Sequence, residues 1–128
     1  MNQVVEEWIA KAEGDFSTAE REFAVVNSPN YDAVCFHSQQ CIEKLFKALM
    51  IKFKVTPPKI HDLAELNRQL RSLCPSWHPE IEDLNYLTRA AVDFCYPGES
   101  ADKDEAEGAI RIARMLRAEL LELLAPNQ

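Results

Sequence analysis

The 128-residue sequence lacks the residues and motifs that most known active sites require. Its three glycines leave no room for a glycine-rich loop that cradles phosphate, and no G-x-x-x-x-G-K-[ST] motif occurs. No G-x-S-x-G nucleophile motif occurs either. His37, His61 and His78 lie far apart, without Cys or carboxylate residues at metal-ligand spacing. We therefore expect no metal and no cofactor, and these motifs identify no catalytic residue.

Cysteine pairs and long apolar runs are also missing. The four cysteines form no C-x-x-C pair, and we interpret them as small buried hydrophobic residues in a reducing compartment: Cys35, Cys41, Cys74 and Cys95. No apolar run approaches the roughly 18 residues of a membrane span. The acidic N-terminus has no signal-peptide pattern. We expect a cytoplasmic protein that does not contact a membrane.

Positive charge is scarce and unevenly placed. The chain has 14 Lys and Arg against 21 Asp and Glu, a net charge of −7, which argues against coating nucleic acid by bulk electrostatics. Residues 41–71 nevertheless carry seven Lys and Arg and three Asp and Glu. This locally basic zone could contact phosphate or another acidic surface, and the charge count does not distinguish the two.

What the chain has in abundance is helical periodicity. Apolar residues recur at three- and four-residue steps in five segments, and no segment has the pattern of a strand. The predicted helices span about 3–26 and 31–54, a short segment after Asp62, a segment with Pro79 in its first turn, and a last segment after Asp102. Both aspartates have a Glu three residues later, which is capping-box spacing.

This pattern predicts the fold class. We expect an all-α, antiparallel bundle of about five helices in a single domain, residues 1–128. The two end helices and the second helix would form the bundle, with the third and fourth as smaller covers. On the last helix we expect an arginine ridge to face solvent and the acids Glu107 and Glu119: Arg111, Arg114 and Arg117.

The second predicted helix carries an unusual polar stripe. At 100° per residue, its polar residues fall within about a third of the circumference: His37, Gln40, Glu43, Lys44 and Lys47. The rest of the helix is mostly apolar, which is typical of a central helix. Two interpretations remain open. His37 and Gln40 could bind a base or phosphate edge beside two lysines, or the stripe could be a hydrogen-bonded seam with ordinary i,i+4 pairing of Glu43 and Lys47.

Several motifs together resemble the prokaryotic HEPN domain family over essentially the whole chain. They are Trp8, Ala33-x-x-Phe36-His37-x-x-Gln40-x-x-Glu43-Lys44-x-x-Lys47-Ala48-Leu49, His61-Asp62-Leu63-x-x-Leu66 and Tyr96-Pro97-Gly98. The resemblance implies a helical bundle that commonly forms a homodimer. It also implies nucleotide or RNA binding, often beside a small nucleotidyltransferase partner in toxin–antitoxin-like modules.

Many members of this family are metal-independent ribonucleases that use an Arg, four to six residues, then a His. The His would act on the ribose 2′-hydroxyl and the Arg would stabilise the phosphorane. Here Arg89 is followed by Tyr96 instead, and Cys95 takes the place of an Arg common before that Tyr. The literal match of Arg71 with His78 crosses a predicted helix break at Cys74-Pro75.

We therefore expect a HEPN-type protein of the nucleotidyltransferase-associated kind that dimerises and binds nucleotide, RNA or a nucleotidyltransferase partner, without efficient catalysis. Alanines on the last helix would permit close helix approach at a dimer interface: Ala106, Ala109 and Ala113. The candidate ligand-binding residues are His37, Gln40, Lys44, Lys47, His61, Arg89 and Tyr96. The alternatives are an RNA endonuclease toxin, using Arg89 or Arg71 with His78 or Tyr96, and an interaction module without a small ligand.

Overall fold

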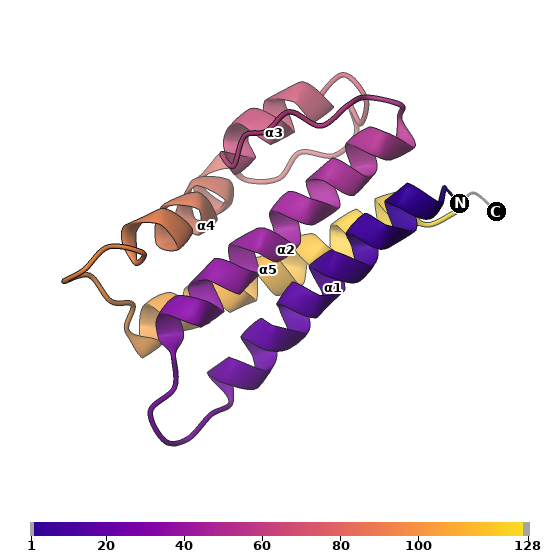
Figure 1. Cartoon of the computed structure of the whole chain (residues 1–128). Coiled ribbons are helices and arrows are strands. Elements are labelled where there is room, and N and C mark those ends of the chain that lie inside the picture. The colour runs from indigo at the N-terminus through magenta and orange to yellow at the C-terminus, as the bar shows by residue number, and fades with distance from the viewer. Residues whose placement is uncertain (1, 127–128) are drawn as a thin grey trace.

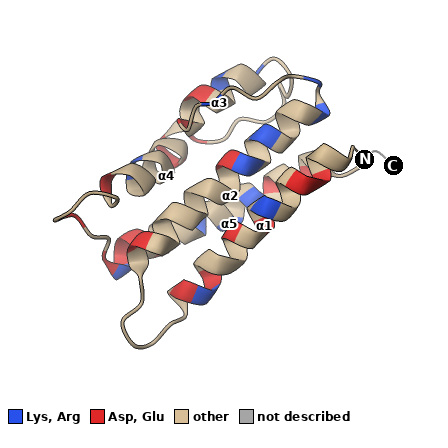
Figure 2. Cartoon of the chain, in the orientation of Figure 1, with Lys and Arg blue, Asp and Glu red and all other residues tan. Residues whose placement is uncertain are grey.

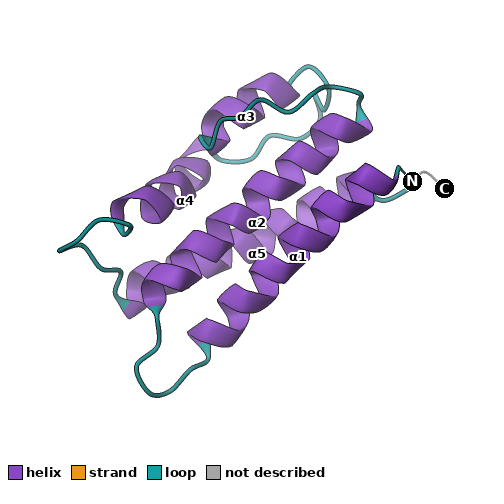
Figure 3. Ribbon diagram, viewed as in Figure 1, coloured by secondary structure: helices purple, strands orange, loops and turns teal. Residues whose placement is uncertain are grey.

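The predicted all-α fold class is confirmed. The computed structural model describes residues 2–126, and within them the chain forms helices and connecting loops with no strand (Figure 3). The helices are α1 (Gln3–Phe23), α2 (Tyr31–Lys52), α3 (Leu63–Leu70), α4 (Ile81–Asp93) and α5 (Lys103–Leu124).

Helix α2 lies at the centre of the bundle, as its apolar circumference predicted. It contacts all four other helices, and α1 and α4 run opposite to α2 and α5 (Figure 1). Thirteen of the residues of α2 are buried, against five of α1 and eight of α5, so α2 is the most buried of the helices. The short α3 and α4 cover one side of α2, which is the arrangement expected from their lengths.

The helix ends follow local capping chemistry, with three departures from prediction. Asp102 and Glu105 form a complete capping box at α5. Asp62 caps α3, but the Glu65 carboxylate bonds the Arg68 guanidinium instead of returning to the cap. Pro79 precedes the N-cap residue of α4 and lies outside the helix. The third departure is that α1 and α2 end at Phe23 and Lys52, two or three residues earlier than the periodicity suggested.

The cysteine prediction is right for three residues and wrong for one. Cys35, Cys41 and Cys74 are buried free thiols, and burial raises the pKa of Cys35 and of Cys41 to about 12. Cys95 is exposed because it lies in the turn after α4, beyond the packed helix.

Two expectations about α5 are wrong. Ala106, Ala109 and Ala113 are fully buried, so the close approach that they permit is inside this chain and not at a dimer interface. The expectation that the arginine ridge faces Glu107 and Glu119 is wrong for Arg114 and Arg117, which bond carboxylates on α1, while Arg111 is exposed to solvent as expected. Arg117 bonds Glu13 and lies over the Phe16 ring, and Arg114 bonds Glu20, because α1 runs alongside α5.

A buried ion pair on α2 supports the connection that leads into α3. Lys47 Nζ donates to Glu43 Oε2 at 3.0 Å, and Gln39 Nε2 donates to Glu43 Oε1 at 3.0 Å. Burial alone raises the pKa of the Glu43 carboxyl, but hydrogen bonds from Gln39, Lys47 and His61 outweigh burial and hold its pKa below the ordinary value. Glu43 is therefore ionised at neutral pH.

We predict that Glu43→Gln destabilises the protein by about 3 kcal/mol at neutral pH, because the substitution leaves the buried Lys47 ammonium without a carboxylate. Replacing both residues, as Glu43→Gln with Lys47→Met, should restore much of the loss. Urea denaturation measures both effects. The exposed pair of Glu65 with Arg68 is the control, and Glu65→Gln should change stability much less.

The difference in stability between wild type and Glu43→Gln should depend on pH, and its direction follows from the lowered pKa of Glu43. A carboxyl whose folded-state pKa is lowered stabilises the fold above its unfolded pKa, and this contribution is lost as pH falls. The difference between wild type and Glu43→Gln should therefore shrink as pH falls below the ordinary Glu value of 4.5. Equal stabilities of the two proteins at pH 7 would contradict the prediction.

Candidate ligand-binding cleft

The largest cleft with an apolar lining lies between α2 and α4. Its volume is about 420 Å³. Residues three and four apart share a helix face, which explains how Phe36, Gln39 and Gln40 on α2 come to face α4. The residues that line the cleft are Phe36, Gln39, Gln40, His61, Thr88, Ala91, Val92, Cys95 and Tyr96.

One part of this cleft is aromatic and open to solvent. Phe36 is 40% exposed and Tyr96 is 63% exposed, both unusually high for side chains of this size. Val92 on α4 also lines the cleft and is exposed. The cleft therefore offers uncovered aromatic surface to a flat apolar ligand.

The other part of the cleft is polar and fixed by the buried Glu43. The His61 ring lies with Nδ1 at 3.0 and 3.1 Å from the two Glu43 oxygens, and Gln39 Nε2 is 3.3 Å from the His61 carbonyl oxygen. Gln40 Nε2 donates to Gln39 Oε1 at 2.8 Å. A chain of hydrogen bonds therefore runs from the core carboxylate to the cleft wall.

The structure divides the predicted site residues among separate places. Gln40, His61 and Tyr96 line the α2–α4 cleft. Lys47 is buried against Glu43 and does not line it. The polar stripe of α2 is thus shared between neighbouring helices, and only part of it faces the cleft.

His37 and Lys44 point to α1 instead of α4. Asp15 on α1 accepts from both, with its Oδ1 2.8 Å from His37 Nδ1 and its Oδ2 2.6 Å from Lys44 Nζ. The Asp15 side chain is buried between the two helices. Acidic residues lie beside basic ones along α1 and α2 (Figure 2), so two lysines of the basic zone, Lys44 and Lys47, are paired with carboxylates.

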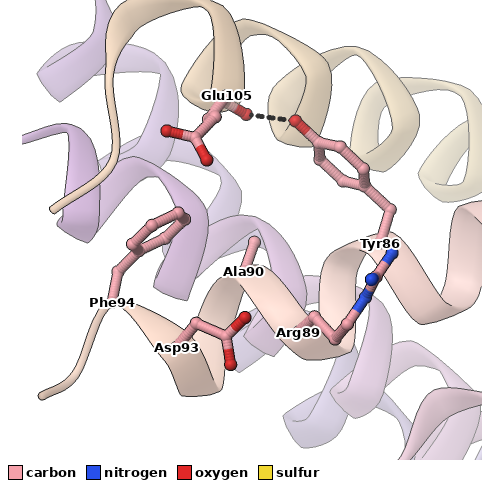
Figure 4. Close-up of a pocket in the computed structure, with 6 residues that line it drawn as sticks. All are labelled: Tyr86, Arg89, Ala90, Asp93, Phe94 and Glu105. Atoms are coloured by element: carbon pink, nitrogen blue, oxygen red, sulfur yellow. Dashed lines mark hydrogen bonds between the residues drawn. The ribbon is translucent and has the colours of Figure 1, made fainter. Parts of the chain in front are cut away.

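Arg89 lines a second, smaller cleft of about 220 Å³ between α4 and α5 (Figure 4). Here the Tyr86 hydroxyl donates to the Glu105 carbonyl oxygen at 2.9 Å. Asp93 and Phe94 complete the wall. Arg89 and Tyr96 therefore line different clefts, on different faces of the α4 region.

Sequence reasoning did not assign Phe36, Gln39, Thr88, Val92 and Cys95 to the site, although they line the cleft. The spacing of these residues could have identified them. Residues three and four apart lie on one helical face, and Thr88, Ala91, Val92 and Cys95 follow this spacing towards Tyr96. Thr88 has a structural bond too, since its Oγ1 accepts from the Leu63 backbone N–H at 3.2 Å.

The described residues contain neither a metal-binding cluster nor a membrane-spanning helix. Within 2–126, no three His, Cys, Asp or Glu side chains come together as a metal site would require. None of the helices in this region combines the length and apolar character needed to cross a bilayer.

Comparison with known proteins identifies solved structures with a similar fold and a matching domain family. A comparison with curated proteins gave no match. The crystal structure of TT1696 from Thermus thermophilus is similar with a TM-score of 0.79 and 21% identity, covering 95% of this chain and 98% of that one. The crystal structure of ST0689, an archaeal HEPN homologue, is similar with a TM-score of 0.72 and 22% identity, covering 98% of this chain and 100% of that one. The model of the HEPN domain matches residues 5–123, and the chain accordingly belongs to the HEPN domain family.

Proposed function

We propose that this HEPN protein binds the base of a nucleotide or of single-stranded RNA in the α2–α4 cleft, without cleaving it efficiently. The observation that carries the proposal is the pair of exposed aromatic side chains, Phe36 and Tyr96, in one cleft with polar groups at its other end. Unpaired bases stack on such aromatic surfaces and form hydrogen bonds through their edges.

The electrostatics of the cleft favour recognition of the base over recognition of phosphate. None of the described residues that line it is Lys or Arg. Lys44 and Lys47 each have a carboxylate partner, so their charge is already compensated. Because phosphate contacts are the source of salt-dependent affinity, binding here should depend little on salt.

The arrangement does not favour phosphodiester cleavage. That chemistry needs a base beside the 2′-hydroxyl and a cation at the phosphate. The described cleft contains His61 but no Lys or Arg, and Arg89 lies in the other cleft. The endonuclease alternative would require these separated groups to meet on one substrate.

We also propose that the protein forms a homodimer through α4. Ile81, in the first turn of this helix, is an exposed apolar residue that lies outside the cleft, and exposed apolar residues on a small bundle often mark a partner surface. The sequence resemblance supports a nucleotidyltransferase partner protein and a toxin–antitoxin setting, and the unpaired cysteines support a cytoplasmic location. All three stay part of the proposal.

Adenosine and AMP should bind with similar affinity, and the affinity should change little between low and moderate salt. Phe36→Ala should weaken both by about tenfold, because stacking of a base on an aromatic ring contributes about 1–3 kcal/mol. Isothermal titration calorimetry measures this. Phe53→Ala is the matched control, since Phe53 is also 40% exposed but lies outside the cleft. A marked preference for AMP that Lys44→Ala abolishes would contradict a base-binding cleft.

Purified protein should not cleave mixed single-stranded RNA in metal-free buffer, because no arginine accompanies the cleft histidine. Gel analysis of products over time measures turnover. Cleavage that persists through stringent purification and disappears in Arg89→Ala or His78→Ala would instead establish the endonuclease alternative.

Light scattering at low micromolar concentration should give twice the chain mass of 14.6 kDa. Ile81→Glu places a charge on the exposed α4 face outside the cleft and should shift the mass to that of the monomer. Val26→Glu, in the loop between α1 and α2, is the control and should leave the dimer intact. A monomeric wild-type protein would refute dimerisation.

A further inference from the structure

We propose that His61, held by Glu43, is the specificity-determining acceptor of the cleft and selects heteroaromatic rings that carry an amino group. This inference rests on the proposed base binding. It concerns which rings bind, whereas the proposed function concerns only whether a ring binds there.

The first step is the protonation pattern of the His61 ring. Nδ1 faces both oxygens of Glu43, at 3.0 and 3.1 Å. An ionised carboxylate only accepts hydrogen bonds, so Nδ1 must carry a proton. In the neutral ring Nε2 is then an acceptor. Among the described residues, the hydrogen bonds of this ring are those at Nδ1.

The second step is that the ring is held although it is exposed. The His61 side chain is 76% exposed and lines the cleft. Its Glu43 partner is itself fixed by Lys47 and Gln39, and Gln39 also bonds the His61 backbone. The core therefore fixes the position of this acceptor before a ligand arrives, so binding loses little conformational entropy of the His61 side chain.

The third step is the character of the neighbouring polar groups. Gln40 uses one N–H of its Nε2 to donate to Gln39, which leaves its Oε1 free to accept and its second N–H free to donate. His61 Nε2 and Gln40 Oε1 give this part of the cleft two acceptors, without any Lys or Arg among the described lining residues. An amino group on a ring supplies the donors that such a site requires, whereas a ring lacking donors leaves the acceptors unpaired.

The test compares adenosine with purine riboside, which differs only by lacking the exocyclic amino group. We expect wild-type protein to bind adenosine about tenfold more tightly than purine riboside at pH 8. His61→Asn can still donate to Glu43 but has no acceptor at the Nε2 position, so it should lose most of this preference. His78→Asn, an exposed histidine outside the cleft, should retain the preference.

The outcomes separate the two proposals. Equal binding of both nucleosides to wild type, with both weakened by Phe36→Ala, would overturn the role of His61 and leave the base-binding cleft in place. Failure of both nucleosides to bind would overturn the proposed function as well. The comparison of the two nucleosides on wild-type protein needs no substitution, so a lack of preference overturns the role of His61 even where His61→Asn fails to fold.

Discussion

A carboxylate inside a protein needs donors for both of its oxygens, and the way Glu43 obtains them organises much of this molecule. Two donors come from its own helix, Lys47 and Gln39, and the third comes from His61, just before α3. The connection between α2 and α3 is therefore anchored to the central helix. Since α3 packs on α4, the same anchor also fixes the cleft between α2 and α4.

The helices could be predicted from the sequence because the apolar residues that become buried recur with the period of an α-helix. The apolar circumference of α2 identified the central helix, and the Asp102 capping box identified the start of α5. The last turns of α1 and α2 were placed too late because periodicity continues past the point where the backbone leaves the helix. At α2 this point is marked by Lys54, whose φ of 62° is outside the helical region.

The candidate site could be predicted only in part, because helical spacing does not say which neighbour each side chain meets. A stripe that covers a third of α2 is wide enough to touch two partners. His37 and Lys44 meet Asp15 on α1, whereas Gln40 faces α4. Phe36 was not among the predicted site residues, yet it is exposed and lines the cleft. Charge counted along the sequence does not show pairing, because the acidic partners of Lys44 and Lys47 come from α1 and from the same helix.

The contact of Tyr86 with α5 has a consequence for the opposite face of α4. Gly108 lies where any larger residue would place its Cβ about 2.5 Å from the Tyr86 hydroxyl oxygen, and that hydroxyl bonds the Glu105 carbonyl oxygen. The missing side chain thus lets α4 sit close to α5 at one defined register. The distance between α4 and α2, and with it the width of the cleft, is consequently governed from a side of α4 that no ligand in the cleft would touch.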